Sequence, residues 1–264
     1  MKPSELVNYR NGEGRIYIPN EIFEDLKKII DKGVNIAFAY SYYYLITYLY
    51  RYSKYVEKRF TQPLLKELLG FSPTNKKIDY IIKKDGVLDT IGYTRTVKDY
   101  PVSYHLDDDK IPNFTLLSEW KVSHPEYAIT QPEERNFRIK YPVKAFYRNE
   151  MAEYNDYFNG TFFEARNTHG IEIKTFLDMM DSDTEHELKC IGFYLYGFLC
   201  SRIGQYGGDW TAISKQQLVI DTRLSNWTID TYIRRLQKRG FITVTHQDFF
   251  NNPAKLANVY EIKR

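Results

Sequence analysis

Apolar residues recur at helical spacing along the first third of the chain. Four segments show this spacing, namely 21–31, 35–53, 61–69 and 74–85. In the first of them, the apolar residues that share one face are Ile22, Phe23, Leu26, Ile29 and Ile30. The residues suited to cap helices here are Asn20, Thr61 and Thr74, and those suited to end them are Gly33, Gly70 and Gly86. We therefore predict four helices in this region.

Two extended stretches follow these helices. Segments 87–96 and 102–106 are rich in strand-forming residues, and a short loop, 97–100, separates them. We predict that they pair as an antiparallel hairpin. The next segment, 107–160, begins with three aspartates and contains four prolines. Its composition favours an irregular connector, whose apolar residues pack it onto the flanking domains.

The last hundred residues repeat this order of elements. Helices are predicted over 172–180 and 185–202, and a polar start at Trp210 and Thr211 leads into a short helix over 215–220. A second helix opens at Ser225 and ends before Gly240. A strand (241–246), a polar loop (247–258) and a closing strand (259–263) complete the segment. Phe176 and Gly240 follow Phe23 and Gly86 by about 150 residues each, which indicates a duplicated unit.

Composition limits the class of protein. A chain of 264 residues can form two small domains, and its 24 tyrosines and 16 phenylalanines should lie mostly in their cores. The net charge of +3 is modest, so any phosphate-binding surface must be local. Cys190 and Cys200 lie in one predicted helix, too far apart for a disulfide. Free thiols, the absence of an apolar leader and the lack of a membrane-spanning stretch predict a cytoplasmic location with no membrane partner.

The C-terminal segment resembles the winged helix-turn-helix superfamily of DNA-binding proteins. The stretches that carry the resemblance are 214–218 (SKQQL), 225–229 (SNWTI) and 236–242 (LQKRGFI). The first unit, with YIPNEIF at 17–23, resembles the N-terminal domain of replication initiators from plasmids and phages of Gram-positive bacteria. The resemblance implies binding to a replication origin and repression of the protein's own promoter.

The predicted fold is α+β and mainly α, with two tandem winged-helix domains joined by the irregular connector. The N-terminal domain is expected over 1–106, the connector over 107–160 and the C-terminal domain over 161–264.

In the C-terminal domain, the helix after Ser225 is the expected recognition helix. Its N-terminal half should enter the major groove, where Asn226 and Thr231 would contact base edges and Arg234 a guanine or a phosphate. Trp227 could contact a base or fill an interface with a partner. The candidate DNA-binding residues of this domain are Lys215, Arg223, Ser225, Asn226, Trp227, Thr231, Arg234, Arg235, Lys238 and Lys255.

In the N-terminal domain, the candidate DNA-binding residues are Asn75, Lys76, Lys77, Lys83 and Arg95. Lysine contacts would position the protein through phosphates and would not specify a sequence. A winged helix can also bind a protein or form a dimer, and this alternative stays open for the N-terminal domain.

The sequence contains few features that indicate an enzyme. The five histidines are scattered, and although His186 and Cys190 are one helical turn apart, no further ligand completes a zinc site. There is no Walker loop and no GxGxxG motif. The aspartates of the run at 107–109 would alternate between two faces of a strand and would not converge on a metal. We therefore expect no enzyme, no metal and no cofactor.

These patterns predict a non-enzymatic, sequence-specific protein that binds double-stranded DNA. Such a protein would come from a plasmid or phage and act in DNA replication or in transcription regulation. The alternative is a non-catalytic adaptor that binds proteins of a replication or conjugation complex. A homodimer, or a complex with a replication protein, is compatible with both.

Overall fold

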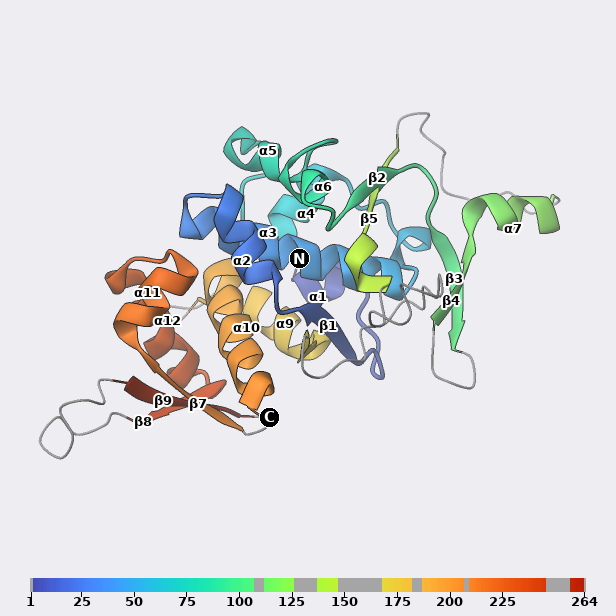
Figure 1. Cartoon of the computed structure of the whole chain (residues 1–264). Coiled ribbons are helices and arrows are strands. Elements are labelled where there is room, and N and C mark those ends of the chain that lie inside the picture. The colour runs from blue at the N-terminus through green and yellow to red at the C-terminus, as the bar shows by residue number, and fades with distance from the viewer. Residues whose placement is uncertain are drawn as a thin grey trace, which may run out of the picture. The chain divides into compact units, whose positions relative to one another are not determined.

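The computed structural model of the chain describes residues 2–106, 112–125, 137–146, 168–181, 187–206, 209–245 and 257–263. In these residues the structure is α+β and mainly helical with small antiparallel sheets, which confirms the predicted fold class (Figure 1). The chain divides into two compact units. The first contains 1–18 and 42–164, and the second contains 19–41 and 165–264.

The first unit is built from short elements. They are α1 (Pro3–Leu6), η1 (Lys54–Val56), α4 (Gln62–Leu68), η2 (Lys76–Ile78), α5 (Asp79–Ile82), α6 (Val87–Thr90), β2 (Arg95–Val97), β3 (Pro101–Leu106), β4 (Pro112–Leu116), α7 (Leu117–Ser123), β5 (Ile139–Tyr141) and η3 (Val143–Phe146). Strand β1 (Arg15–Pro19) and helix α3 (Gly33–Arg51) have residues in both units.

The hairpin predicted over 87–106 does not form. Residues 87–90 are the helical turn α6, β2 pairs antiparallel with β5, and β3 pairs antiparallel with β4. Asp89 of α6 explains the first pairing, because it accepts hydrogen bonds from Thr94 and Thr96 and forms a 2.7 Å ion pair with the buried Lys140 of β5. A buried ammonium needs such oxygen partners. The connector is therefore not irregular throughout, since its described part supplies β4, α7 and β5.

The helix predicted over 74–85 is also broken, into η2 and the four-residue α5. Asn75, and not Thr74, caps it by accepting a hydrogen bond from the Lys77 amide at 3.0 Å. The buried Lys66 of α4 donates to the Asn75 carbonyl at 2.8 Å and pairs with Asp79. The ammonium of Lys66, on another helix, therefore determines where α5 begins. Helical periodicity along 74–85 does not reveal this contact.

The two glycines that aligned the proposed repeat have different roles. Gly240 follows the last helix with a φ of +74°, a left-handed conformation that favours glycine. Gly86 is extended and precedes α6, and a Cβ there would lie 2.6 Å from the Tyr80 carbonyl oxygen. The match between these glycines is therefore a match in sequence without a match in conformation.

The second unit is built from longer elements. They are α2 (Ile22–Ile29), the start of α3, β6 (Thr168–Glu172), α9 (Ile173–Met180), α10 (Lys189–Tyr206), β7 (Trp210–Ser214), α11 (Lys215–Thr222), α12 (Asn226–Lys238), β8 (Ile242–Thr245) and β9 (Ala257–Ile262). The polar start at Trp210 is thus a strand, β7. It pairs antiparallel with β9, which also pairs with β8, so the order in this sheet is β7-β9-β8 (Figure 1).

An aromatic cluster explains why segment 19–41 belongs to the second unit and not to the N-terminal domain expected over 1–106. Phe23 of α2 stacks on Tyr40 of α3 with ring centroids 5.3 Å apart. Its edge-on contact with Phe198 of α10 has the same separation, and Tyr194 of α10 lies at 5.7 Å. All four rings are buried. Because aromatic burial contributes strongly to core stability, α2 is held against α10.

His169 of β6 completes this cluster as a neutral, fully hydrogen-bonded side chain. Its Nδ1 lies 2.8 Å from the Asn20 amide oxygen, which can only accept, so Nδ1 carries the proton. Its Nε2 then accepts from the Tyr40 hydroxyl at 2.7 Å. Burial lowers the pKa of His169 to about 3. The Asn20 side chain therefore bonds His169 and does not cap α2.

The remaining predicted helices are close to their expected positions. In α2 the expected inward residues are buried except Ile29, which is exposed. In α9, Ile173, Phe176, Leu177 and Met180 recur at helical spacing and are all buried. Among the described residues, none of the helices combines the length and the apolar character that a membrane crossing requires.

Gly33 provides a close contact between two backbone segments of the second unit. A Cβ at this position would lie 2.4 Å from the Arg223 carbonyl oxygen, in the turn between α11 and α12. Backbone atoms cannot rotate away as a flexible side chain can, so any larger residue must displace the turn.

We expect Gly33→Ala to lower the free energy of unfolding of the second unit by about 1–3 kcal/mol, the usual cost of overpacking. The measurement is urea denaturation of the full chain. Gly14→Ala is the matched control, because a Cβ at Gly14 meets no atom within 4 Å and should leave stability unchanged or slightly raised. Equal stability of the two variants would contradict the proposed contact.

A second prediction concerns acid. Because the folded-state pKa of His169 lies below its usual value of 6.5, its neutral form stabilises the protein above pH 6.5, and this contribution is lost as pH falls towards 3. Below pH 6.5, unfolding free energy should therefore fall more steeply in the wild type than in His169→Gln, by up to about 1.4 kcal/mol per pH unit. Urea titrations between pH 7.5 and 4.5 measure the difference, and parallel curves would refute the assignment.

Candidate nucleic-acid interface

Helices α11 and α12 are joined by a tight turn, and residues within this segment determine its geometry. Ser214 caps α11 by accepting from the Gln217 amide at 3.1 Å, and Ser225 caps α12 by accepting from the Thr228 amide at 3.1 Å. Between them, Arg223 adopts a left-handed conformation with φ of +56°. The predicted start of the second helix at Ser225 is confirmed. The Ser225 hydroxyl oxygen accepts from the Thr228 amide, so the role of this side chain is to cap α12.

Helix α12 has one buried face and one exposed face. The helical spacing predicts Ile229, Leu236 and either Tyr232 or Ile233 on the inner face; the buried residues are Ile229, Ile233 and Leu236. On the opposite side, four residues at positions i, i+4, i+7 and i+11 form a stripe that we call the α12 outer face: Trp227, Thr231, Arg234 and Lys238. Trp227, Arg234 and Lys238 are exposed and Thr231 is half-buried, and the stripe contains no carboxylate.

Trp227 is the most unusual member of the α12 outer face. It lies in the first turn of the helix, and its side chain is 72% exposed. Tryptophan is enriched among the residues that anchor interfaces, so a ring exposed to this extent is a candidate for contact with another molecule. Asn226, its exposed neighbour, lies outside the stripe but in the same first turn.

The two neighbouring arginines of α12 differ in their partners. The Arg235 guanidinium donates to the Glu187 carbonyl at 2.8 Å and lies 5.0 Å from the Tyr232 ring centroid. Arg234 donates only through Nε, to the Asp230 carbonyl of its own helix at 3.1 Å, and has no ion pair within the described residues. Arg235 is therefore a structural residue, whereas Arg234 is exposed and its two terminal nitrogens have no partner within the described residues.

Two further candidate cations have partners inside the protein. Lys215 forms a 2.5 Å ion pair with Asp230, which ties the start of α11 to α12 and neutralises the carboxylate nearest the α12 outer face. Arg223 donates to the Ile30 carbonyl at 3.0 Å and to Asp31 at 3.2 Å. Arg223 was expected to contact phosphate, but these bonds assign its guanidinium to the connection between α2 and α3.

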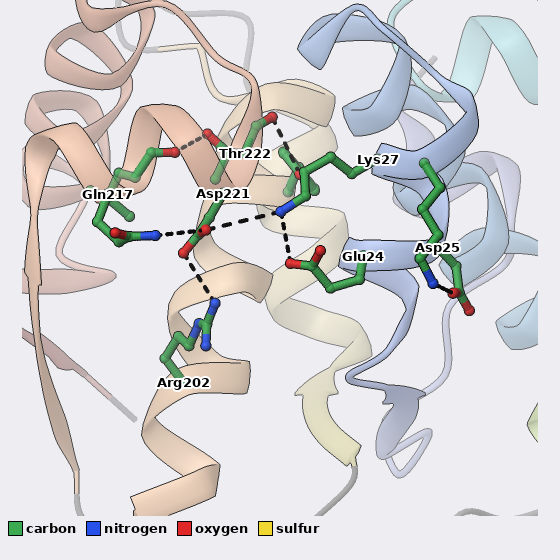
Figure 2. Close-up of polar contacts among 10 residues, drawn as sticks. Glu24, Asp25, Lys27, Arg202, Gln217, Asp221 and Thr222 are labelled. Atoms are coloured by element: carbon green, nitrogen blue, oxygen red, sulfur yellow. Dashed lines mark hydrogen bonds and ion pairs between the residues drawn. The ribbon is translucent and has the colours of Figure 1, made fainter.

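Asp221 fixes α11 against its neighbours, as Figure 2 shows. This buried carboxylate accepts from Gln217 at 2.9 Å and from Arg202 of α10 at 3.1 Å, and the Lys27 ammonium of α2 lies 4.0 Å away. Lys27 also pairs with Glu24 at 2.7 Å. The network links α2, α10 and α11. It thereby holds the end of α11, which is followed by the turn into α12.

A hollow of about 300 Å³ lies beside the α12 outer face. Its polar lining includes Lys215, Asp230, Arg234, Gln237 and Asn258, so that α12 forms one side and β9 the other. Gln237 was not among the predicted candidates. The signal for it was its spacing, because it follows Arg234 by three residues on a helix.

Lys255, the candidate in the predicted polar loop 247–258, has no described position. The loop 246–256 between β8 and β9, and with it Lys255, lies outside the described residues. The strands that carry this loop are present and paired from Ile242 with Ile262 to Thr245 with Val259.

The candidates of the first unit do not share one helix face. Lys76 and Lys77 lie in η2, Lys83 follows the end of α5, and Arg95 lies on β2 with its guanidinium 5.3 Å from the Tyr141 ring centroid. Asn75 is used as a cap. Lys76, Lys77, Lys83 and Arg95 are exposed, but the continuous recognition helix that was to unite the four residues from Asn75 to Lys83 is absent.

Comparisons of the chain with protein-family models, with curated proteins and with solved structures find no match. The case for a function therefore depends on the geometry of α11, α12 and the sheet beside them.

The different partners of the two arginines give a stability prediction. Arg235→Ala should lower the free energy of unfolding by about 1 kcal/mol, because it removes a charged hydrogen bond and a cation–π contact. Arg234→Ala should change it by less than about 0.5 kcal/mol, since its terminal nitrogens have no partner in the described protein. Thermal and urea unfolding of the two variants test this difference, and equal destabilisation would contradict it.

Proposed function

We propose that this protein binds double-stranded DNA through α12, as a winged helix-turn-helix protein with the sheet β7-β9-β8 beside the recognition helix. One observation carries the proposal. The α12 outer face combines two cations with a polar and an aromatic side chain and has no carboxylate. It lies opposite the buried residues of α12, a helix that follows a tight turn.

The dimensions support this proposal. An α-helix with its side chains fits the major groove of B-form DNA. The α12 outer face extends over twelve residues, from Trp227 to Lys238, about 16 Å along the helix axis. Its N-terminal part would enter the groove and Lys238, near the C-terminal end, would contact a phosphate. The modest net charge of +3 agrees with a local interface of this size.

The cellular role that we propose is replication initiation or transcription regulation in a plasmid or phage. A second domain and the exposed cations of the first unit support an extended complex, either on DNA or with a second copy or a replication protein. Sequencing the fragments of the source genome that the protein retains tests this role, because an initiator or regulator should select its own origin or promoter.

A protein-binding adaptor is the second candidate, and the exposure of Trp227 is the observation that favours it. Tryptophan is enriched at the centres of protein interfaces. The two candidates differ in their salt dependence. Phosphate contacts release counterions, so affinity for duplex DNA falls steeply as salt rises, whereas an adaptor should bind random duplex weakly at all salt concentrations.

We expect the double variant Arg234→Ala, Lys238→Ala to bind random duplex DNA about tenfold more weakly at 100 mM salt and to show a salt dependence lower by about one phosphate contact, that of Lys238. Fluorescence anisotropy between 50 and 300 mM salt measures both quantities on the full chain.

Lys174→Ala is the matched control, because Lys174 is an exposed lysine on α9, away from the α12 outer face. It should bind like the wild type. If the double variant also binds like the wild type, α12 is not the contact helix. If the wild type shows no salt-dependent DNA binding, the adaptor is the better proposal.

A further inference from the structure

We propose that Trp227 recognises the C5-methyl group of a thymine and Arg234 the Hoogsteen edge of a guanine about three base pairs away. The inference rests on the proposed DNA-binding function and names the bases that the α12 outer face reads.

Trp227 matches the one apolar group that the major groove offers. The thymine methyl is exposed there, whereas the other base edges present hydrogen-bond donors and acceptors. Trp227 lies in the first turn of α12, the part of a recognition helix that enters most deeply, and its ring is 72% exposed. Burying this ring against a methyl group would remove apolar surface from water on both molecules.

Arg234 has the geometry that a guanine requires. The Nε bond to the Asp230 carbonyl fixes one side of the guanidinium, and no partner within the described residues uses the terminal nitrogens Nη1 and Nη2. Two parallel N–H groups match the O6 and N7 acceptors of guanine. Arg235, with its guanidinium bound to the Glu187 carbonyl, cannot take this role without losing that bond.

The spacing of the two residues sets the spacing of the bases. Seven residues separate Trp227 from Arg234, nearly two turns of helix, so both lie on one face about 10 Å apart. That distance corresponds to about three base-pair steps of about 3.4 Å each. Thr231 lies between them on the same face and is short enough to leave the intervening bases accessible.

Selection of bound duplexes from a random library, with the full chain, tests the inference. We expect an enriched motif that contains a thymine and a guanine about three positions apart. In this motif, replacing the thymine by uracil removes only the methyl group and should weaken wild-type binding about fivefold. Replacing the guanine by 7-deazaguanine removes only N7 and should weaken it about tenfold.

The variants identify which residue reads which base. Trp227→Ala should lose its sensitivity to uracil and keep its sensitivity to 7-deazaguanine. Arg234→Ala should lose its sensitivity to 7-deazaguanine and keep its sensitivity to uracil, because no donor then reaches N7. Both side chains are exposed, and unchanged thermal midpoints should show that the variants fold.

The outcomes separate the inference from the proposed function. An enriched motif whose uracil and 7-deazaguanine effects persist in the variants, or that lacks this pair of bases, overturns the base assignment while DNA binding stands. Failure to enrich any motif, with equal binding to scrambled duplexes, overturns sequence-specific recognition itself.

Discussion

The start of α3 and the turn between α11 and α12 touch through their backbones, and the candidate interface depends on this contact. Gly33 has no Cβ, which leaves room for the Arg223 carbonyl, and the Arg223 guanidinium donates back to the carbonyl of Ile30. The Asp221 network adds side-chain contacts between the same helices. Because the turn is held from both sides, the direction in which α12 leaves it is fixed by residues near the other end of the sequence.

This arrangement divides the cations of α11, α12 and the turn between them into two groups. Lys215, Arg223 and Arg235 have carboxylate or carbonyl partners within the second unit and stabilise its fold. Arg234 is exposed, and within the described residues its guanidinium bonds only a carbonyl of its own helix. Some cations of a basic segment bond carbonyl and carboxylate oxygens within the protein. Such a segment therefore contributes fewer residues to an interface than its number of cations suggests. The same division explains why a protein of low net charge can still present a local basic stripe.

Local signals predicted the second unit well. Ser214 and Ser225 precede apolar residues at helical spacing and cap their helices, and Gly240 follows the last turn in a left-handed conformation. These signals act within four residues and need no partner from elsewhere. Strands β8 and β9 lie close to their predicted positions for a similar reason, because alternating residues on both sides of a polar loop favour a hairpin. Asn20 is an exception, since a buried histidine far along the chain uses its side chain.

The first unit shows what local signals miss. Three buried lysines, Lys54, Lys66 and Lys140, each contact a carboxylate and a backbone carbonyl from distant segments. These contacts decide where β5 pairs and where α5 begins, and no periodicity along the chain encodes them.

The sequence by itself determined the mainly helical class, the caps of α11 and α12, and which residues of α12 are buried, because each depends on neighbours within one or two helical turns. Only the tertiary structure decided that segment 19–41 completes the second unit, that β2 pairs with β5, and that Arg223 and Arg235, unlike Arg234, bond carbonyls from distant segments. The physical reason is that burial, ion pairing and backbone contact join residues far apart in sequence, and only the folded chain brings those partners together.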